Sequence, residues 1–162
     1  VERSRGLGDV YKRQGQKKKV FMCFALATNT SLLVMDEPSN GLDIPSKSQF
    51  RKVIASGMTD EKSVIISTHQ VRDIDSLLDH VVIIDGTRVL LNESVKTICE
   101  KLYFVEQGMN ESTDTALYVQ PSVQGNSVIF PNTENEETNL NLEVLFNAML
   151  AEREKMQTMF NK

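Results

Sequence analysis

The segment Leu32–Pro38 constrains this chain more than any other part of it, because four apolar residues (LLVM) run directly into two adjacent carboxylates, Asp36 and Glu37. An apolar run of this length, stopped by a proline, is typical of a strand buried on both faces of a parallel sheet. Open α/β sheets bind ligands at the carboxyl ends of such strands. Burying two neighbouring acids is costly unless a cation or a proton partner compensates. The segment therefore predicts an α/β fold with a cation at this strand end.

A second predicted strand, Ser63–Ser67, is followed directly by Thr68 and His69. In a parallel sheet this histidine would lie beside the two carboxylates. A strand-end carboxylate can hold Mg²⁺ beside phosphate groups, a second carboxylate can polarise an attacking water, and an imidazole can contact a phosphate. The same residues also permit a purely structural interpretation, in which the acids cap a turn and the histidine has no chemical role. The pairing of an acidic strand end with an imidazole favours the chemical interpretation.

The rest of the first hundred residues alternates between helices and strands. The pattern predicts helices over 16–27, 43–57, 71–78 and 94–102, and strands over 81–84 and 88–92 joined by a hairpin turn at Asp85-Gly86. Alternating elements with short connections are typical of a layered α/β domain with a mainly parallel sheet. Residues 1–14 show no periodicity, and we expect them to be a non-native or disordered lead.

From residue 103 onward the pattern changes to weak strands between polar loops, at 103–105, 116–119 and 127–130. The acidic, Asn-rich stretch 131–138 predicts a linker, and Asn139 or Asn141 is a candidate cap for a last helix. The apolar side of that helix consists of Leu142, Leu145, Phe146, Met149 and Leu150, and we expect it to pack as core rather than on a second subunit. We therefore expect a small α+β appendage over 106–162.

Composition excludes several classes of protein. The 162 residues carry a net charge of -4, and residues 1–20 alone hold seven basic against two acidic residues, so the basic residues do not form the folded patch of a nucleic-acid-binding domain. No apolar run approaches the ~20 residues of a membrane-spanning helix, and no signal-peptide pattern opens the chain. Cys23 and Cys99 lack metal-ligand spacing and are predicted to be buried free thiols of an intracellular protein.

Together these residues resemble the ATP-binding subunit of ABC transporters. Leu32–Glu37 is similar to the family's Walker B segment, Ser39–Asp43 to its D-loop, Ser67–His69 to its switch-histidine loop, and Gly15-Gln16 to the end of its signature motif. Order and spacing agree with the family over about residues 15–105. The resemblance implies a layered P-loop NTPase-like domain, of which this chain holds the C-terminal half.

The resemblance also implies a role for each matching residue. Asp36 would assist Mg²⁺ binding, directly or through water, Glu37 would be the catalytic base, and His69 would sense the γ-phosphate of ATP. The other implied contacts are to the nucleotide and across a dimer of two ATP-binding subunits. They would be made by Gly15, Gln16, Ser39 and Asp43.

Two departures from the family's pattern stand out. The phosphate-cradling Walker A loop, G-x-x-x-x-G-K-[ST], does not occur in the 162 residues, and Lys12–Gln16 reads KRQGQ where the family reads LSGGQ. Arg13 thus replaces the small hydroxyl that the family presents to the γ-phosphate. We hypothesise that the chain is the C-terminal part of an ABC ATPase, preceded by fourteen foreign residues, and that it is inactive alone. A genuine but degenerate signature motif is the alternative.

The function implied by the resemblance is ATP hydrolysis that drives a separate membrane permease subunit, with export as the preferred direction. The implied partners are that permease and a second ATP-binding subunit, without nucleic acid, on the cytoplasmic face of the cell membrane. Two alternatives stay open: a soluble ABC ATPase acting on ribosomes or DNA, and a non-catalytic interaction module on the same scaffold. The intact acids and His69 argue against the second alternative.

Overall fold

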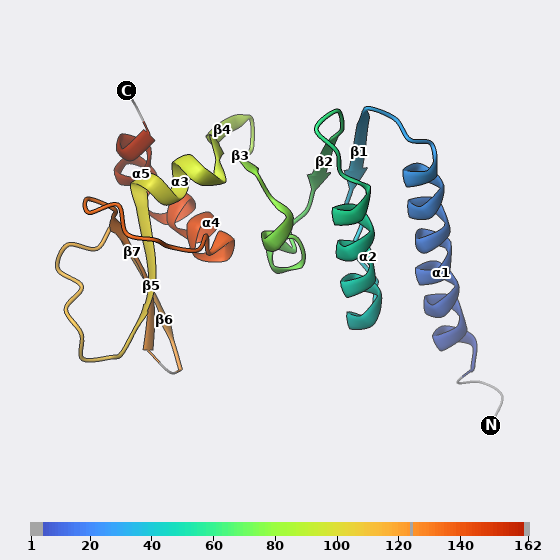
Figure 1. Cartoon of the computed structure of the whole chain (residues 1–162). Coiled ribbons are helices and arrows are strands. Elements are labelled where there is room, and N and C mark those ends of the chain that lie inside the picture. The colour runs from blue at the N-terminus through green and yellow to red at the C-terminus, as the bar shows by residue number, and fades with distance from the viewer. Residues whose placement is uncertain (1–4, 124, 161–162) are drawn as a thin grey trace. The chain divides into compact units, whose positions relative to one another are not determined.

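The computed structural model describes residues 5–123 and 125–160, and for residues 5–15, 73 and 76 it describes the backbone alone. The chain divides into two compact units, one within residues 1–77 and one within residues 78–162. We refer to them as the first and the second unit. Each contains its own helices and strands (Figure 1).

The described residues of the first unit form one pair of strands, two long helices and two 3-10 turns. Its elements are α1 (Arg5–Ala27), β1 (Leu32–Asp36), α2 (Ile44–Gly57), β2 (Ser63–Ser67), η2 (Val71–Asp73) and η3 (Asp75–Leu77). Helix α1 begins at Arg5, within the segment that shows no periodicity in the sequence. The helix predicted over 71–78 is wrong, because the two short 3-10 turns take its place. Three aspartates within residues 73–79 disfavour a continuous α-helix there.

Strands β1 and β2 pair in parallel, from Leu32 opposite Ser63 to Asp36 opposite Ser67. One face of the pair is covered, and Met35 is buried there, as are Phe50 and Ile54 of α2. The other face is open, with Leu32, Val34 and Ile65 between 53% and 65% exposed. The prediction of a strand buried on both faces is therefore wrong for the described chain.

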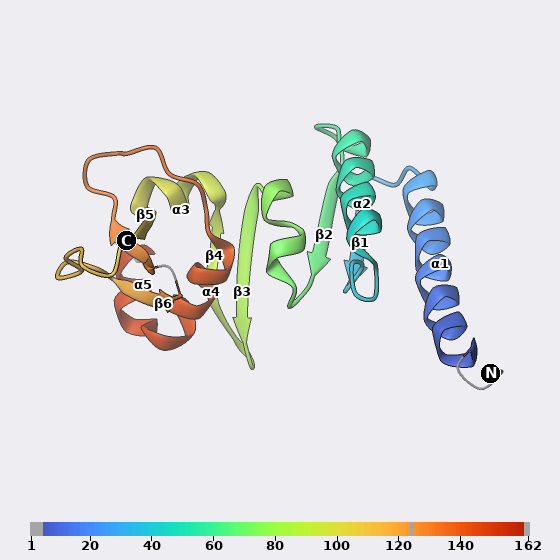
Figure 2. The same ribbon diagram turned by 90° about the horizontal axis from the view of Figure 1, so that it is seen from below.

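Helices α1 and α2 lie side by side in the first unit (Figures 1 and 2). A groove of about 120 Å³ between them is lined mainly by apolar side chains, including Met22 and Leu26 of α1 and Phe50 and Val53 of α2. Cys23 also lines this groove but is exposed, so the prediction of a buried thiol is wrong for this residue.

The second unit, as far as its residues are described, is built from antiparallel strands and three helices. Its elements are β3 (His80–Asp85), β4 (Arg88–Ser94), α3 (Val95–Lys101), β5 (Leu102–Gln107), β6 (Tyr118–Ser122), β7 (Gly125–Pro131), α4 (Leu142–Ala151) and α5 (Arg153–Phe160). Strands β3 and β4 form the predicted hairpin, and the other strands form a sheet in the order β5-β7-β6. The protein is therefore a mixed α/β protein with both parallel and antiparallel strand pairs. A mainly parallel sheet is not confirmed, because β1 and β2 are the sole parallel pair among the described strands.

The core of the second unit joins residues on both sides of position 105. Its fully buried large side chains are Ile98, Leu102, Val128, Ile129, Leu145, Met149 and Met156. Of the two predicted candidates, Asn139 and Asn141, it is Asn141 that caps α4, by accepting the backbone N–H of Val144 at 3.2 Å. Most of the predicted apolar side of α4 is buried, whereas Phe146 and Leu150 stay 36% and 46% exposed.

Candidate functional site at the carboxyl ends of β1 and β2

The parallel register brings the two predicted strand ends to one edge of the sheet. Asp36 is paired with Ser67, and the backbone N–H of Glu37 donates to the carbonyl oxygen of Ser67 at 2.8 Å, one residue beyond β1. Since both strands run in the same direction, the residues that follow them leave the sheet at the same end. The structure therefore brings Asp36 and Glu37 close to the segment Thr68-His69.

The carboxylate of Glu37 is held by donors from the end of β2. Its Oε1 accepts the backbone N–H of His69 at 2.9 Å and lies 2.6 Å from His69 Nδ1. Its Oε2 accepts the hydroxyl of Thr68 at 3.1 Å. The side chain of Glu37 is 28% exposed and that of His69 is 71% exposed, so the pair lies at a surface that a ligand can reach.

The backbone and the charge of Glu37 both depend on this arrangement. Its φ of 46° lies in the left-handed region, which non-glycine residues occupy rarely and which is frequent at functional sites. Partial burial acts to raise the pKa of Glu37, but the hydrogen bonds from the side chain and backbone of His69 and from Thr68 outweigh it. The pKa of Glu37 therefore lies below its ordinary value, and the carboxylate is charged at neutral pH.

Asp36 is exposed, so the predicted burial of two adjacent acids is wrong. The Ser67 hydroxyl donates to Asp36 Oδ1. In the part of the chain that the structure describes, no group of three or more His, Cys, Asp or Glu side chains is arranged to hold a metal ion. An exposed strand-end carboxylate does fit Mg²⁺, which proteins commonly hold through one or two carboxylates together with substrate phosphates and water.

The other predicted contact residues have structural surroundings. Asp43 caps α2, because its Oδ1 accepts the backbone N–H of Ser46 at 3.0 Å and also the Ser46 hydroxyl. These two hydrogen bonds, the side-chain one first, hold the pKa of Asp43 below its ordinary value. Ser39 is fully buried, and its hydroxyl has no hydrogen-bond partner among the described residues. Gln16 is exposed on α1, and Gly15 lies in the part of α1 that is described by its backbone alone.

Two residues to which the sequence assigned no role make further contacts at the site. The Thr68 hydroxyl donates to Glu37 and accepts the backbone N–H of Gln70 at 3.0 Å. The Lys18 ammonium group donates to the carbonyl oxygen of Asn40 at 2.7 Å. The position of Thr68 between a strand and a histidine was a usable signal. Nothing in the sequence pairs Lys18 with a residue 22 positions later.

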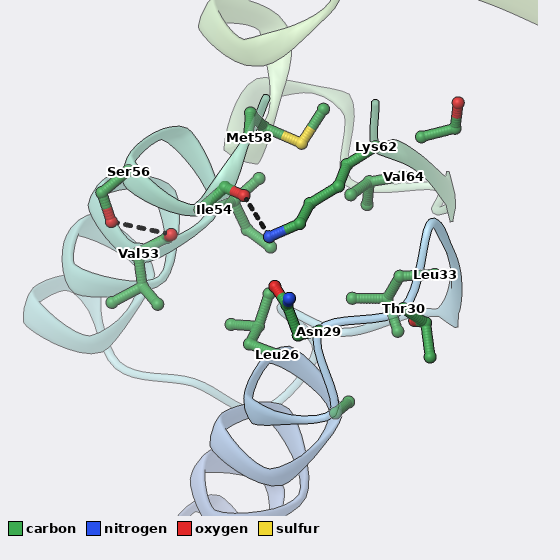
Figure 3. A pocket seen from close by; sticks show the side chains of 13 residues that line it. Leu26, Asn29, Thr30, Leu33, Val53, Ile54, Ser56, Met58, Lys62 and Val64 are labelled. Carbon is green, nitrogen blue, oxygen red and sulfur yellow. Dashed lines mark hydrogen bonds between the residues drawn. The ribbon is translucent and has the colours of Figure 1, made fainter. Parts of the chain in front are cut away.

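A cavity of about 170 Å³ lies at the opposite, amino-terminal ends of β1 and β2 (Figure 3). At its rim the Lys62 ammonium group donates to the carbonyl oxygen of Gly57 at 3.2 Å, and the Ser56 hydroxyl donates to that of Val53 at 3.0 Å. Both bonds satisfy carbonyl groups at the end of α2, which is ordinary helix capping. None of the lining residues is acidic or a histidine, so the cavity does not extend the site.

Sequence comparison finds relatives that are named as transporter proteins. The chain is 29% identical over 93 residues to an ABC transporter ATP-binding protein of Methanocaldococcus jannaschii, covering 57% of this chain and 36% of the relative. It is 31% identical over 99 residues to the chelated iron transport system membrane protein YfeB of Yersinia pestis, covering 61% and 33%. It is 29% identical over 87 residues to the ABC transporter ATP-binding protein NatA of Bacillus subtilis, covering 54% and 35%.

No protein-family model matches the chain. The chain spans about a third of the length of these curated relatives. None of the helices described in residues 5–123 and 125–160 is long and apolar enough to cross a membrane.

The fold and the site define a mixed α/β protein that carries carboxylates, hydroxyls and an imidazole at one edge of a parallel strand pair. The relatives add a likeness to a family: the matched part of the chain is similar to part of the ATP-binding proteins of ABC transporters.

Proposed function

We propose that this chain is part of the ATP-binding subunit of an ABC-type exporter, in which ATP hydrolysis drives a separate membrane permease. Residues 15–105 would belong to the ATPase domain and residues 106–162 to an appendage, with β1 and β2 forming part of a larger parallel sheet in the whole protein. The subunit would act as a dimer on the cytoplasmic face of the membrane. The observation that carries the proposal is the convergence of Thr68 and His69 on the Glu37 carboxylate beside exposed Asp36.

Each residue at this edge has a chemical task that fits its surroundings. Asp36 would hold Mg²⁺, which when bound neutralises charge on the β- and γ-phosphates. Glu37 would accept a proton from the attacking water, since its low pKa keeps it ionised. Its Oε2 accepts one hydrogen bond, from Thr68, and so keeps a lone pair for that water. His69, which is largely exposed, can turn toward the γ-phosphate.

The remaining predicted contacts fit supporting tasks. The carboxylate of Asp43 is occupied by Ser46 at the start of α2, so its coupling role would be exerted through the position of that helix. Buried Ser39 would act through the loop between β1 and α2, because its hydroxyl is not accessible to a nucleotide. Gln16 and Gly15 would approach the nucleotide of the second subunit.

The direct test uses the full-length protein whose gene encodes this segment. Glu37→Gln should lower kcat for ATP hydrolysis by about 100-fold or more, with little change in the Kd for Mg-ATP, because the change removes a proton acceptor and keeps the shape of the side chain. Glu61→Gln is a matched control, since Glu61 is exposed in the loop before β2. Equal kcat values for the two variants would contradict the assignment of Glu37.

The isolated 162-residue chain is expected to bind and hydrolyse ATP negligibly, because it contains no Walker A sequence. Calorimetric titration with Mg-ATP and a phosphate-release assay measure both properties. Phosphate release by this chain that disappears in Glu37→Gln would show that the inactivity is wrong while the role of Glu37 is right.

A further inference from the structure

Helix α1 makes polar contact with the loop that carries the site through one half-buried lysine. The Lys18 ammonium group donates to the carbonyl oxygen of Asn40 at 2.7 Å and reaches the carbonyl oxygen of Glu37 at 3.5 Å. These two carbonyl groups belong to the turn between β1 and α2. One cation therefore bridges both ends of the four-residue turn Glu37–Asn40.

Two backbone hydrogen bonds tie this turn to its surroundings: the N–H of Glu37 donates to the carbonyl oxygen of Ser67 at 2.8 Å, and the N–H of Leu42 donates to that of Ser39 at 3.1 Å. Neither bond involves the carbonyl group of Glu37 or of Asn40. The backbone N–H of Asn40 reaches the carbonyl oxygen of Glu37 at 3.3 Å, which is a long hydrogen bond. Glu37 itself has a positive φ of 46°, a conformation that costs energy for a residue with a side chain. The buried hydroxyl of Ser39 adds no hydrogen bond to any described residue. A charged donor on two of its carbonyl groups is thus a principal contact that fixes the turn.

The conformation of the turn determines where the Glu37 carboxylate points. With φ at 46° the side chain meets the hydroxyl of Thr68 and the backbone and imidazole of His69. If the turn relaxed to negative φ, the Cα–Cβ bond would point in another direction and these contacts would be lost. The position of Lys18 is therefore coupled to the position of a carboxylate that lies 19 residues later.

We propose that Lys18 is a positioning residue whose ammonium group holds the turn Glu37–Asn40 so that the Glu37 carboxylate faces Thr68 and His69. The proposal rests on and deepens the proposed function, because the Glu37 carboxylate is the proton acceptor in that function. It implies that the position of α1 affects the orientation of this carboxylate. It concerns the geometry of this chain alone. It can therefore be tested without ATP, and it can fail while the ATPase assignment stands.

The test compares Lys18→Met with Lys17→Met in the 162-residue chain. Both variants lose one positive charge at neighbouring positions, and Lys17 is exposed. The backbone amide proton of His69, which donates to the Glu37 carboxylate, should exchange with solvent about tenfold faster in Lys18→Met, measured by NMR, and much less so in Lys17→Met. Lys18→Arg should restore the slow exchange, because a guanidinium group can also donate to two carbonyl oxygens. A purely structural role of Lys18 would lower stability in Lys18→Met without this selective change.

Equal changes in the two methionine variants, or no rescue by arginine, would overturn the proposal. A measurement on the unaltered chain decides the matter should Lys18→Met fail to fold. Acetylation of exposed amines should modify Lys18 about tenfold more slowly than Lys17 and Lys19, since the Lys18 amine is held by carbonyl oxygens while the other two side chains are exposed. Equal acetylation rates at the three lysines would show that the contact is not populated, and the proposal would be wrong.

Discussion

The second unit buries fifteen of the twenty core apolar residues among the described residues, whereas the first unit buries five. The first unit also leaves one face of its strand pair open, although parallel sheets are normally covered on both faces. A two-stranded sheet is marginally stable by itself. The comparison teaches that the candidate site lies in the unit with the weaker core. Local contacts such as those of Lys18, Asp43 and His69 therefore matter more there than comparable contacts would in the second unit.

Removing core volume from the second unit should have the largest effect. Leu145 is fully buried, so Leu145→Ala should destabilise the second unit by about 3 kcal/mol. Val34 lies on the open face of β1, and Val34→Ala should cost less than about 1 kcal/mol in the first unit. Urea titrations followed by NMR signals from each unit would measure both effects. Similar losses would break the comparison, because they would show that the open face of β1 is covered in solution.

Backbone strain should have the next largest effect. Gly125 has a φ of +153°, and a Cβ there would overlap the backbone carbonyl of Gln107. Gly125→Ala should therefore destabilise the second unit by about 2 kcal/mol or more. Gly86→Ala is the matched control, since Gly86 also has positive φ but has nothing within 4 Å of the added carbon. Denaturation of the two variants separates the cost of the overlap with Gln107 from the cost of placing alanine at positive φ. An equal loss of stability in both variants would show that the overlap adds nothing.

The two thiols extend the comparison to chemical reactivity. Cys23 of the first unit is exposed, whereas Cys99 of the second unit is partly buried. Burial raises the pKa of Cys99, and a hydrogen bond from the backbone of Leu140 offsets part of that effect. An aromatic disulfide reagent should react with Cys23 about tenfold faster than with Cys99, because the thiolate is the reactive form. Mass spectrometry of each cysteine peptide measures the two rates, and a faster reaction at Cys99 would mean that the second unit opens readily.

The smallest effect concerns pH. The pKa of Glu37 is lowered in the folded chain, so its contacts stabilise the first unit at pH values above the unfolded pKa of about 4.3, and this contribution is lost as the pH falls through the folded pKa. The same sign applies to Asp43. Glu37→Gln should therefore flatten the acid side of the stability profile of the first unit and leave that of the second unit unchanged. NMR-detected unfolding at pH 6 and pH 3.5 provides the measurement, and an unchanged slope in the variant would show that Glu37 makes no such contribution.

Much of the local structure was predictable, because short-range chemistry determines it. Pro45 and Asp43 marked the start of α2, Asp85-Gly86 marked the hairpin, and Asn141 capped α4 as expected. The prediction of a mainly parallel sheet came from the alternation of elements. That pattern does not reveal which strands pair, and the tight turn after β3 reverses the chain.

The burial of individual side chains was also less predictable, because a local pattern does not reveal which elements pack together. The apolar character of Leu32 and Val34 indicated a covered strand, yet coverage depends on which elements lie against it, and the described elements cover one face. The exposed thiol of Cys23 and the exposed carboxylate of Asp36 are further examples. In each case the residue type was read correctly and its neighbours were not.

The sequence by itself determined the candidate chemistry: a strand ending in Asp36 and Glu37, a second strand ending before His69, and a resemblance that the relatives support. Adjacency along the chain is enough to define those strand ends. The tertiary structure alone decided that Thr68 and His69 bind the Glu37 carboxylate and that Lys18 contacts the intervening turn. These contacts join residues far apart in the sequence, so no local pattern reveals them.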